Sequence, residues 1–223
     1  ASDVIFDFDT HPGTATGGGT DYTDISAKYT ISAGVFQTTI AVNTTSETMF
    51  ENDEVMSVTI SSTLNATISI SNNTGTIQNA DTEPGLYIDD LSFNEETTGF
   101  FMVSLSEVSA LDAVFTWITY DNLDAIEGTD YTASSGQGTI PAGSLTTSIS
   151  VIALPLDTLD EPNEQFTLSL TGVSDVTPVD MESVGTITDN DGPPNLYIDD
   201  LTIVEGDTGH MMVSLSAISG LDV

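Results

Sequence analysis

The 223-residue sequence contains no cysteine and no arginine, and Lys28 is its only lysine. The absence of cysteine excludes disulfides, thiolate nucleophiles and metal clusters built on cysteine. Neutralising nucleic-acid phosphates requires lysine and arginine in number, so a nucleic-acid binder is excluded. Docking on an anionic membrane surface is disfavoured for the same reason. The sequence also lacks an apolar run near the ~18–20 residues that cross a bilayer, so no direct membrane insertion is expected.

Negative charge is what the sequence has in excess. It carries 35 aspartates and glutamates and a formal net charge of −34, although only 16% of its residues are charged. Hydrophobic residues make up 39%, which is enough for packed cores rather than a disordered acidic tail. The sequence therefore indicates a folded protein in which many carboxylates must be accommodated.

A long internal repeat sets the domain organisation. Residues 86–113 match residues 196–223 at 17 of 28 positions, at an offset of 110. The segment Gly19–Thr23 returns as Gly128–Thr132 at an offset of 109. This period is far longer than a solenoid repeat and equals the size of a small domain, which indicates a tandem array.

The phase of the repeat predicts one complete and two partial domains. Residues 1–81 match a domain without its first strands, residues 82–192 a complete domain, and residues 193–223 the first strands of a further repeat. Proline and glycine punctuate the expected boundaries, at Pro84-Gly85 and at Gly192-Pro193-Pro194.

Side chains alternate with a period of two along most of each repeat. Phe166, Leu168 and Leu170 alternate with polar residues, and Phe6 and Phe8 do the same near the start of the chain. About seven such segments, separated by turn residues, fill each 110-residue period. The expected fold class is all-β, with tandem immunoglobulin-like antiparallel β-sandwiches.

The acids of the complete repeat fall into four groups, and the three intervals between these groups are 35, 27 and 25 residues. Each interval suits two strand crossings and a turn, which returns an antiparallel chain to the same end of a sandwich. All four groups are therefore expected to meet at one end, beside the linker to the next repeat. The residues are Glu95; Asp130; Asp157, Glu161 and Glu164; and Asp189 and Asp191.

Carboxylates gathered in this way repel one another. At ~4 Å and an effective dielectric constant near 20, one like-charged pair costs on the order of 4 kcal/mol. Raised pKa values or bound cations relieve that repulsion. Carboxylate oxygens without cysteine or histidine favour Ca²⁺, which takes 6–8 oxygen ligands, over Mg²⁺, which keeps most of its water.

Several motifs in order resemble the Calx-β domain, a β-sandwich module of sodium/calcium exchangers, integrin β4 and large bacterial surface proteins. They are Val204-Glu205-Gly206-Asp207, Gly128-Thr129-Asp130-Tyr131, the acids from Asp157 to Glu164, and Gly185–Asp191. The resemblance implies that Ca²⁺ binds where these acids converge. It extends the ligand set to Glu205 in the last partial repeat and, in the first, to Asp21, Glu47, Glu51, Glu54 and Asp81.

The chain departs from the acid-rich members of that family in three places. Thr158 and Leu156 flank Asp157 where such members carry consecutive acids, and Asn190 interrupts the final acid run. The first repeat has Asn79 before Asp81 and lacks an early glutamate. We therefore expect weaker calcium occupancy in the first repeat.

The function predicted from these features is non-enzymatic. We expect a calcium-binding structural repeat of an extracellular filament or adhesin stalk, with Ca²⁺ stiffening the junctions between domains. A small sandwich offers little room for a catalytic cleft, and neither His11 nor His210 has a partner in the matching repeat. Two other functions remain open: a regulatory calcium-sensor module and a carbohydrate-binding adhesive domain.

The expected partners are copies of the chain itself or adjacent repeats, arranged head to tail. Residues 194–223 match the strands that the first repeat lacks, so one copy could complete the open sandwich of the next by β-strand donation. Alternatively, the sequence is a segment of one continuous polypeptide with many repeats, and adjacent repeats are its partners. The partner at a filament tip is not specified by the sequence.

Overall fold

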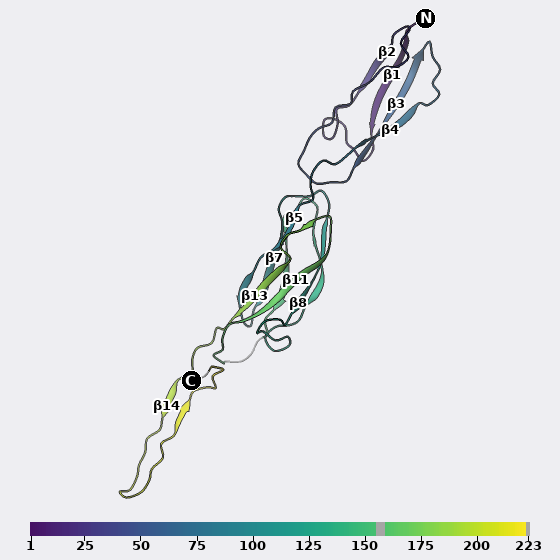
Figure 1. Ribbon diagram of the computed structural model, residues 1–223. Coiled ribbons are helices and arrows are strands. Elements are labelled where there is room, and N and C mark those ends of the chain that lie inside the picture. Colours follow the sequence, from purple (N-terminus) through teal and green to yellow (C-terminus); the bar gives the residue numbers. More distant parts are fainter. Residues whose placement is uncertain (155–158, 222–223) are drawn as a thin grey trace. The chain divides into compact units, whose positions relative to one another are not determined.

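The computed structural model describes residues 1–154 and 159–221. These residues form strands and loops but no helix, and consequently no helix that could cross a membrane. The chain divides into two compact units, which Figure 1 colours from purple to blue and from teal to yellow. Unit 1 contains Ala1–Glu83 and Ser109–Leu111, and unit 2 contains Pro84–Val108 and Asp112–Val223.

Unit 1 is built on one four-stranded sheet with the order β2-β1-β3-β4. All three pairings are antiparallel, and β1 pairs with both β2 and β3. The buried cluster of this unit is small, with Tyr22 and Met56 as its large members. Its strands are β1 (Val4–Pro12), β2 (Ser26–Ile31), β3 (Glu54–Leu64) and β4 (Asn72–Ile77).

Unit 2 contains two sheets. Their orders are β10-β7-β5-β12 and β6-β13-β11-β8-β9. The strands are β5 (Gly85–Ile88), β6 (Leu91–Asn94), β7 (Thr98–Leu105), β8 (Ala113–Tyr120), β9 (Ser135–Ile140), β10 (Thr146–Ile152), β11 (Glu164–Ser174), β12 (Thr177–Pro178) and β13 (Glu182–Thr188). A further pair, β14 (Leu196–Ile198) and β15 (Val213–Leu215), forms its own antiparallel hairpin.

The core of unit 2 comes from residues that alternate along these strands, as the period of two predicts. Phe101 on β7 and Phe166 on β11 are fully buried, with ring centroids 5.8 Å apart. Phe166 also stacks on Tyr131 at 4.3 Å. Gly185 lies against this ring, and a Cβ atom there would stand only 2.4 Å from Cζ of Phe166. Glycine is therefore required for the ring to reach its place.

Two strand pairs depart from the antiparallel pattern expected from the sequence. Strand β12 pairs parallel with β5, and β6 pairs parallel with β13. The second pair arises because the chain leaves one sheet after β5 and enters the other at β6. Asp89 and Asp90 make this crossing: the Asp89 carbonyl accepts a hydrogen bond from Ser183 Oγ at 2.8 Å, and Asp90 Oδ1 accepts one from the Val184 amide at 2.7 Å. These exposed acids thus hold the crossing in place.

Candidate metal centre

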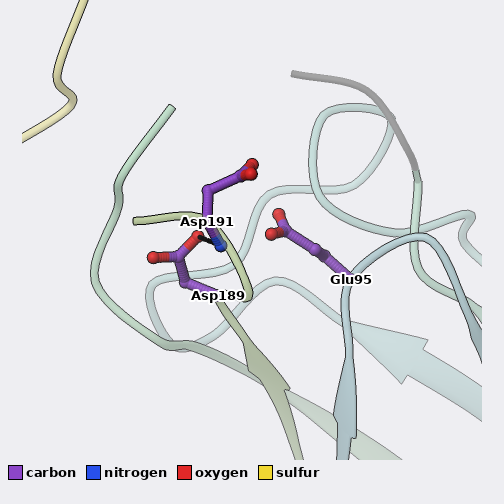
Figure 2. Close-up of side chains that lie close together, drawn as sticks. All are labelled: Glu95, Asp189 and Asp191. Carbon is purple, nitrogen blue, oxygen red and sulfur yellow. Dashed lines mark hydrogen bonds between the residues drawn. The ribbon is translucent and has the colours of Figure 1, made fainter. Parts of the chain in front are cut away.

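Three acids of unit 2 converge where strands β6 and β13 end. Because β6 and β13 run parallel with Thr188 beside Asn94, the next residues, Asp189 and Glu95, leave the sheet at the same end. One carboxylate oxygen each from Glu95, Asp189 and Asp191 lies within 4.8 Å of the others. Figure 2 shows Glu95 facing the two aspartates from the neighbouring segment. These oxygens are close enough to share one cation.

Backbone amides fix the orientation of these carboxylates. The Asn190 amide donates to Glu95 Oε1 at 2.9 Å, and the Asp191 amide donates to Asp189 Oδ1 at 3.2 Å. The Glu161 amide donates to Asp189 Oδ2 at 3.2 Å, which brings the loop of Glu161 to this end. Burial and the negative charge of Asp189 raise the pKa of Glu95 against the opposing effect of the Asn190 hydrogen bond. The ionised form of Glu95 is thus under electrostatic strain that a cation would relieve.

Asp130 and Glu164 form a second acidic group in unit 2. Burial, followed by repulsion from Asp130, raises the pKa of Glu164 to about 7, and the charge of Glu161 contributes in the same direction. Asp130 Oδ2 accepts a hydrogen bond from the Ile126 amide at 2.6 Å, which holds it in its loop. Glu164 is therefore a carboxyl group whose charge is poorly compensated within the protein.

Three further acids of this region were not among the predicted ligands: Asp121, Asp124 and Glu127. Asp124 Oδ1 accepts the Gln165 amide at 2.8 Å and adds to the repulsion felt by Glu164. Asp121 accepts hydrogen bonds from the Glu127 amide and from the Tyr131 hydroxyl. The acidic run from Asp121 to Asp130 was the available signal, but the first repeat has Pro12, Ala15 and Gly18 where the second has Asp121, Asp124 and Glu127.

The raised pKa of Glu164 predicts an unusual pH dependence of stability in the absence of metal. The folded protein holds the Glu164 proton up to about pH 7, whereas the unfolded chain releases it near 4.5. Stability conferred by this group is therefore fully present below pH 4.5 and falls as the pH rises to 7. Denaturant unfolding in chelator between pH 5 and 8 measures this slope. The Glu164→Gln variant should show a shallower slope, and an identical slope would contradict the assignment.

Unit 1 gathers an equivalent set of acids. Asp21, Glu51 and Glu54 lie close to one another. The pKa of each glutamate is raised first by burial and then by neighbouring acids that include Asp21. Glu54 Oε2 is buried and has no hydrogen-bond partner. A cavity of about 100 Å³ lies among them, and its acidic lining consists of Asp21, Glu47, Glu51, Glu54 and Asp81. A buried, unpaired carboxylate oxygen beside other acids fits the requirements of a cation ligand.

At one pair of equivalent positions, the aspartate and the asparagine are interchanged between the two units. In unit 2, Asn163 Oδ1 accepts the Asp189 amide at 3.1 Å; in unit 1, Asp53 Oδ1 accepts the Asn79 amide at 2.9 Å. Asp53 and Asn79 stand at the positions of Asn163 and Asp189, at an offset of 110. The equivalent hydrogen bond therefore forms in both units, with the aspartate as donor residue in unit 2 and as acceptor residue in unit 1.

No basic side chain is available to neutralise these clusters. The sequence holds one lysine and no arginine, and Lys28 pairs with Asp7 at 2.6 Å on the exposed surface of unit 1. His11 Nε2 lies 2.9 Å from Thr59 Oγ1. The donor set is therefore carboxylate oxygen, which suits a hard cation such as Ca²⁺.

The predicted site residues fall into three classes. Asp157 lies outside the described residues. Glu205 is exposed in the loop between β14 and β15, and the structure does not join it to either cluster. The structure places the remaining ones in three groups: Asp21, Glu47, Glu51, Glu54 and Asp81 around one cavity in unit 1, the trio Glu95, Asp189 and Asp191 in unit 2, and Asp130, Glu161 and Glu164 in the second acidic group of unit 2. The Glu161 amide, which donates to Asp189, connects the two groups of unit 2.

Comparison with known proteins identifies the family. The family model of the Calx-beta domain matches residues 1–83 and residues 79–191. Solved structures of similar fold include the apo-form Calx CBD1 domain, at 21% identity and a TM-score of 0.44, covering 49% of this chain and all of that one. The CBD12 structure from CALX1.2 is 14% identical at a TM-score of 0.42 and covers 83% of this chain and 87% of that one. No curated protein matches. Since the two family matches together span most of the sequence, the chain belongs to the Calx-beta domain family.

Proposed function

We propose that this protein is a non-catalytic, calcium-binding structural repeat. The observation that carries the proposal is the twofold occurrence of the cluster: each unit gathers acids at one end without a basic side chain to neutralise them. A related structure is described as the calcium binding domain CBD12 of CALX1.1; it is 16% identical, with a TM-score of 0.37, over 81% of this chain and 71% of that one. The oxygen-only donor set supports Ca²⁺ as the ligand here.

Ca²⁺ would act where each unit continues into the next segment of chain. Asp81 directly precedes Thr82–Gly85, and Asp191 directly precedes Gly192–Asn195, so both cluster ends are covalently attached to linkers. Binding at these acids would restrict the first residues of the linker as well as the loops. We therefore propose a role as a stiffened stalk or filament segment, in an extracellular setting where Ca²⁺ is abundant.

Calcium titration of the full chain tests the function directly. We expect heat of binding in calorimetry and, at 100 times the dissociation constant, a gain in unfolding free energy of about 2.7 kcal/mol per site. For units of this size, that gain corresponds to a rise in unfolding temperature of roughly 10 °C or more. Magnesium at equal concentration is the control and should give a smaller shift. Equal unfolding temperatures in calcium and in chelator would refute calcium binding.

The stalk role requires a separate measurement, because a module can bind calcium without stiffening its linker. Small-angle X-ray scattering of the full chain in calcium and in chelator, fitted with ensembles of conformations, reports the distribution of the radius of gyration. We expect the distribution to narrow in calcium. A calcium-dependent rise in unfolding temperature without that narrowing would leave calcium binding intact and remove the stalk role.

A further inference from the structure

Two neighbouring strands on one side of unit 2 carry no charge. Residues 131–154 contain no aspartate, glutamate, lysine, arginine or histidine, although the whole chain has a formal net charge of −34. This segment forms β9 and β10, which are outer strands of their two sheets and contact each other. Copies of so acidic a chain repel one another wherever their acids meet. These two strands lack the charges that cause the repulsion, so a second copy can approach them.

The backbone edge of β10 is open along most of its length. Strand β10 pairs with β7 on one side. On the other side, the Ile152 carbonyl accepts a hydrogen bond from the Thr132 amide at 2.9 Å, and the described part of the chain places no strand against the rest of this edge. Alternate residues of a strand direct their backbone groups to the same side. The residues that share the direction of Ile152, with amides and carbonyls on the open edge, are Thr146, Ser148 and Ser150.

Strand β10 also lacks the features that protect edge strands from pairing, which are charged side chains, proline, bulges and short length. It has seven residues without charge or proline, and its register with β7 is continuous. The other outer strands of the two sheets are less suited to pairing. β6 and β12 have only four and two residues, and β9 contains Gly136 and Gly138, which weaken a strand.

The exposed side chains of β10 make the strand complementary to itself. Thr146, Ser148 and Ser150 are exposed, whereas Ile149 and Val151 between and beside them are buried in the core of unit 2. Threonine and serine hydroxyls that lie opposite each other on neighbouring strands form stabilising pairs. A second β10 in the antiparallel direction therefore supplies matching hydroxyls and no charge.

We propose that two copies of the chain associate side by side through β10, in antiparallel pairing about a twofold axis at Ser148. Ser148 then lies opposite its own counterpart, and Thr146 of each copy lies opposite Ser150 of the other. The backbone groups of the open edge are satisfied between the copies, and two four-stranded sheets join into one continuous sheet. The proposal does not depend on calcium binding, so its tests are carried out in chelator.

Disulfide trapping tests the register of this pair. The chain has no cysteine, so the single substitution Ser148→Cys places two thiols opposite each other at the twofold axis. Residues of a hydrogen-bonded antiparallel pair have Cα atoms about 5.5 Å apart, within the range of a disulfide. We expect a covalent homodimer on mild oxidation of the folded chain. Ser92→Cys, at an exposed serine of the outer strand β6, is the matched control and should give little product.

A charge at the axis tests the same contact without oxidation. Ser148→Glu places two like charges opposite each other, whereas Ser148→Gln has nearly the same shape without charge. By sedimentation velocity of the full chain, we expect Ser148→Glu to raise the dissociation constant of self-association about tenfold or more, and Ser148→Gln to change it much less. Both variants should unfold at the temperature of the unchanged chain in dilute solution, because Ser148 is exposed.

Three results would overturn the proposal. The first is an unchanged chain that stays monomeric at all concentrations, which would mean that the open edge does not accept a second copy. The second is trapping of Ser148→Cys no greater than that of Ser92→Cys. The third is equal self-association of the Ser148→Glu and Ser148→Gln variants, which would place the contact between copies elsewhere.

Discussion

Glu95→Gln is expected to weaken calcium binding by unit 2 on the order of 10- to 100-fold and, at the same time, to stabilise this unit in chelator. The two effects have one cause. Burial and the charge of Asp189 raise the pKa of Glu95, so its ionised form is unfavourable without a cation and favourable beside one. Glutamine keeps an oxygen that can accept the Asn190 amide but removes the charge.

Calorimetric titration and thermal unfolding of the same variant, with and without chelator, measure both effects. Glu182→Gln is the matched control, because Glu182 is exposed at the other end of β13 and away from the trio. Its calcium affinity should equal that of the unchanged chain. If the Glu95→Gln substitution lowers the stability of unit 2 in chelator and leaves its calcium affinity unchanged, Glu95 has a structural role and the trio is not a calcium site.

Strand counting predicted most of the candidate site. Between Glu95 and Asp130 the chain crosses the sandwich in β7 and β8, and between Glu164 and Asp189 it does so mainly in β11 and β13. An even number of crossings returns the chain to one end, whatever the details of the packing. The convergence of these acids therefore depends on the number of residues between the acidic groups, which can be counted in the sequence.

The contacts that the sequence did not predict depend on pairings between distant loops. Asn190 interrupts the acid run, yet its backbone amide, which any residue except proline provides, holds Glu95. Asn79 stands where unit 2 has Asp189, and Asp53, which the sequence did not relate to it, accepts its backbone amide. The sequence pattern also does not predict the parallel pairing of β6 with β13, because the period of two along one strand does not reveal the direction of the neighbouring strand.

The acid cluster of unit 2 depends on an aromatic core directly beneath it. Phe166 lies two residues after Glu164 and stacks on Tyr131, which follows Asp130 in the chain. The Tyr131 hydroxyl in turn donates to Asp121, so the ring stack connects three acidic positions to the core. Rigid support of this kind determines how closely the carboxylates can be held before a cation binds.

Phe166→Ala is therefore expected to destabilise unit 2 by about 3–5 kcal/mol, because it removes a fully buried ring and leaves a cavity. For a domain of this size, the unfolding temperature should fall by 10 °C or more. Scanning calorimetry in saturating calcium measures the loss, and titration should show weaker calcium binding by unit 2. Phe100→Ala is the control: that ring is 62% exposed on β7, and its removal should change stability by less than about 0.5 kcal/mol. A loss below about 1 kcal/mol for Phe166→Ala would show that the ring stack does not support the site.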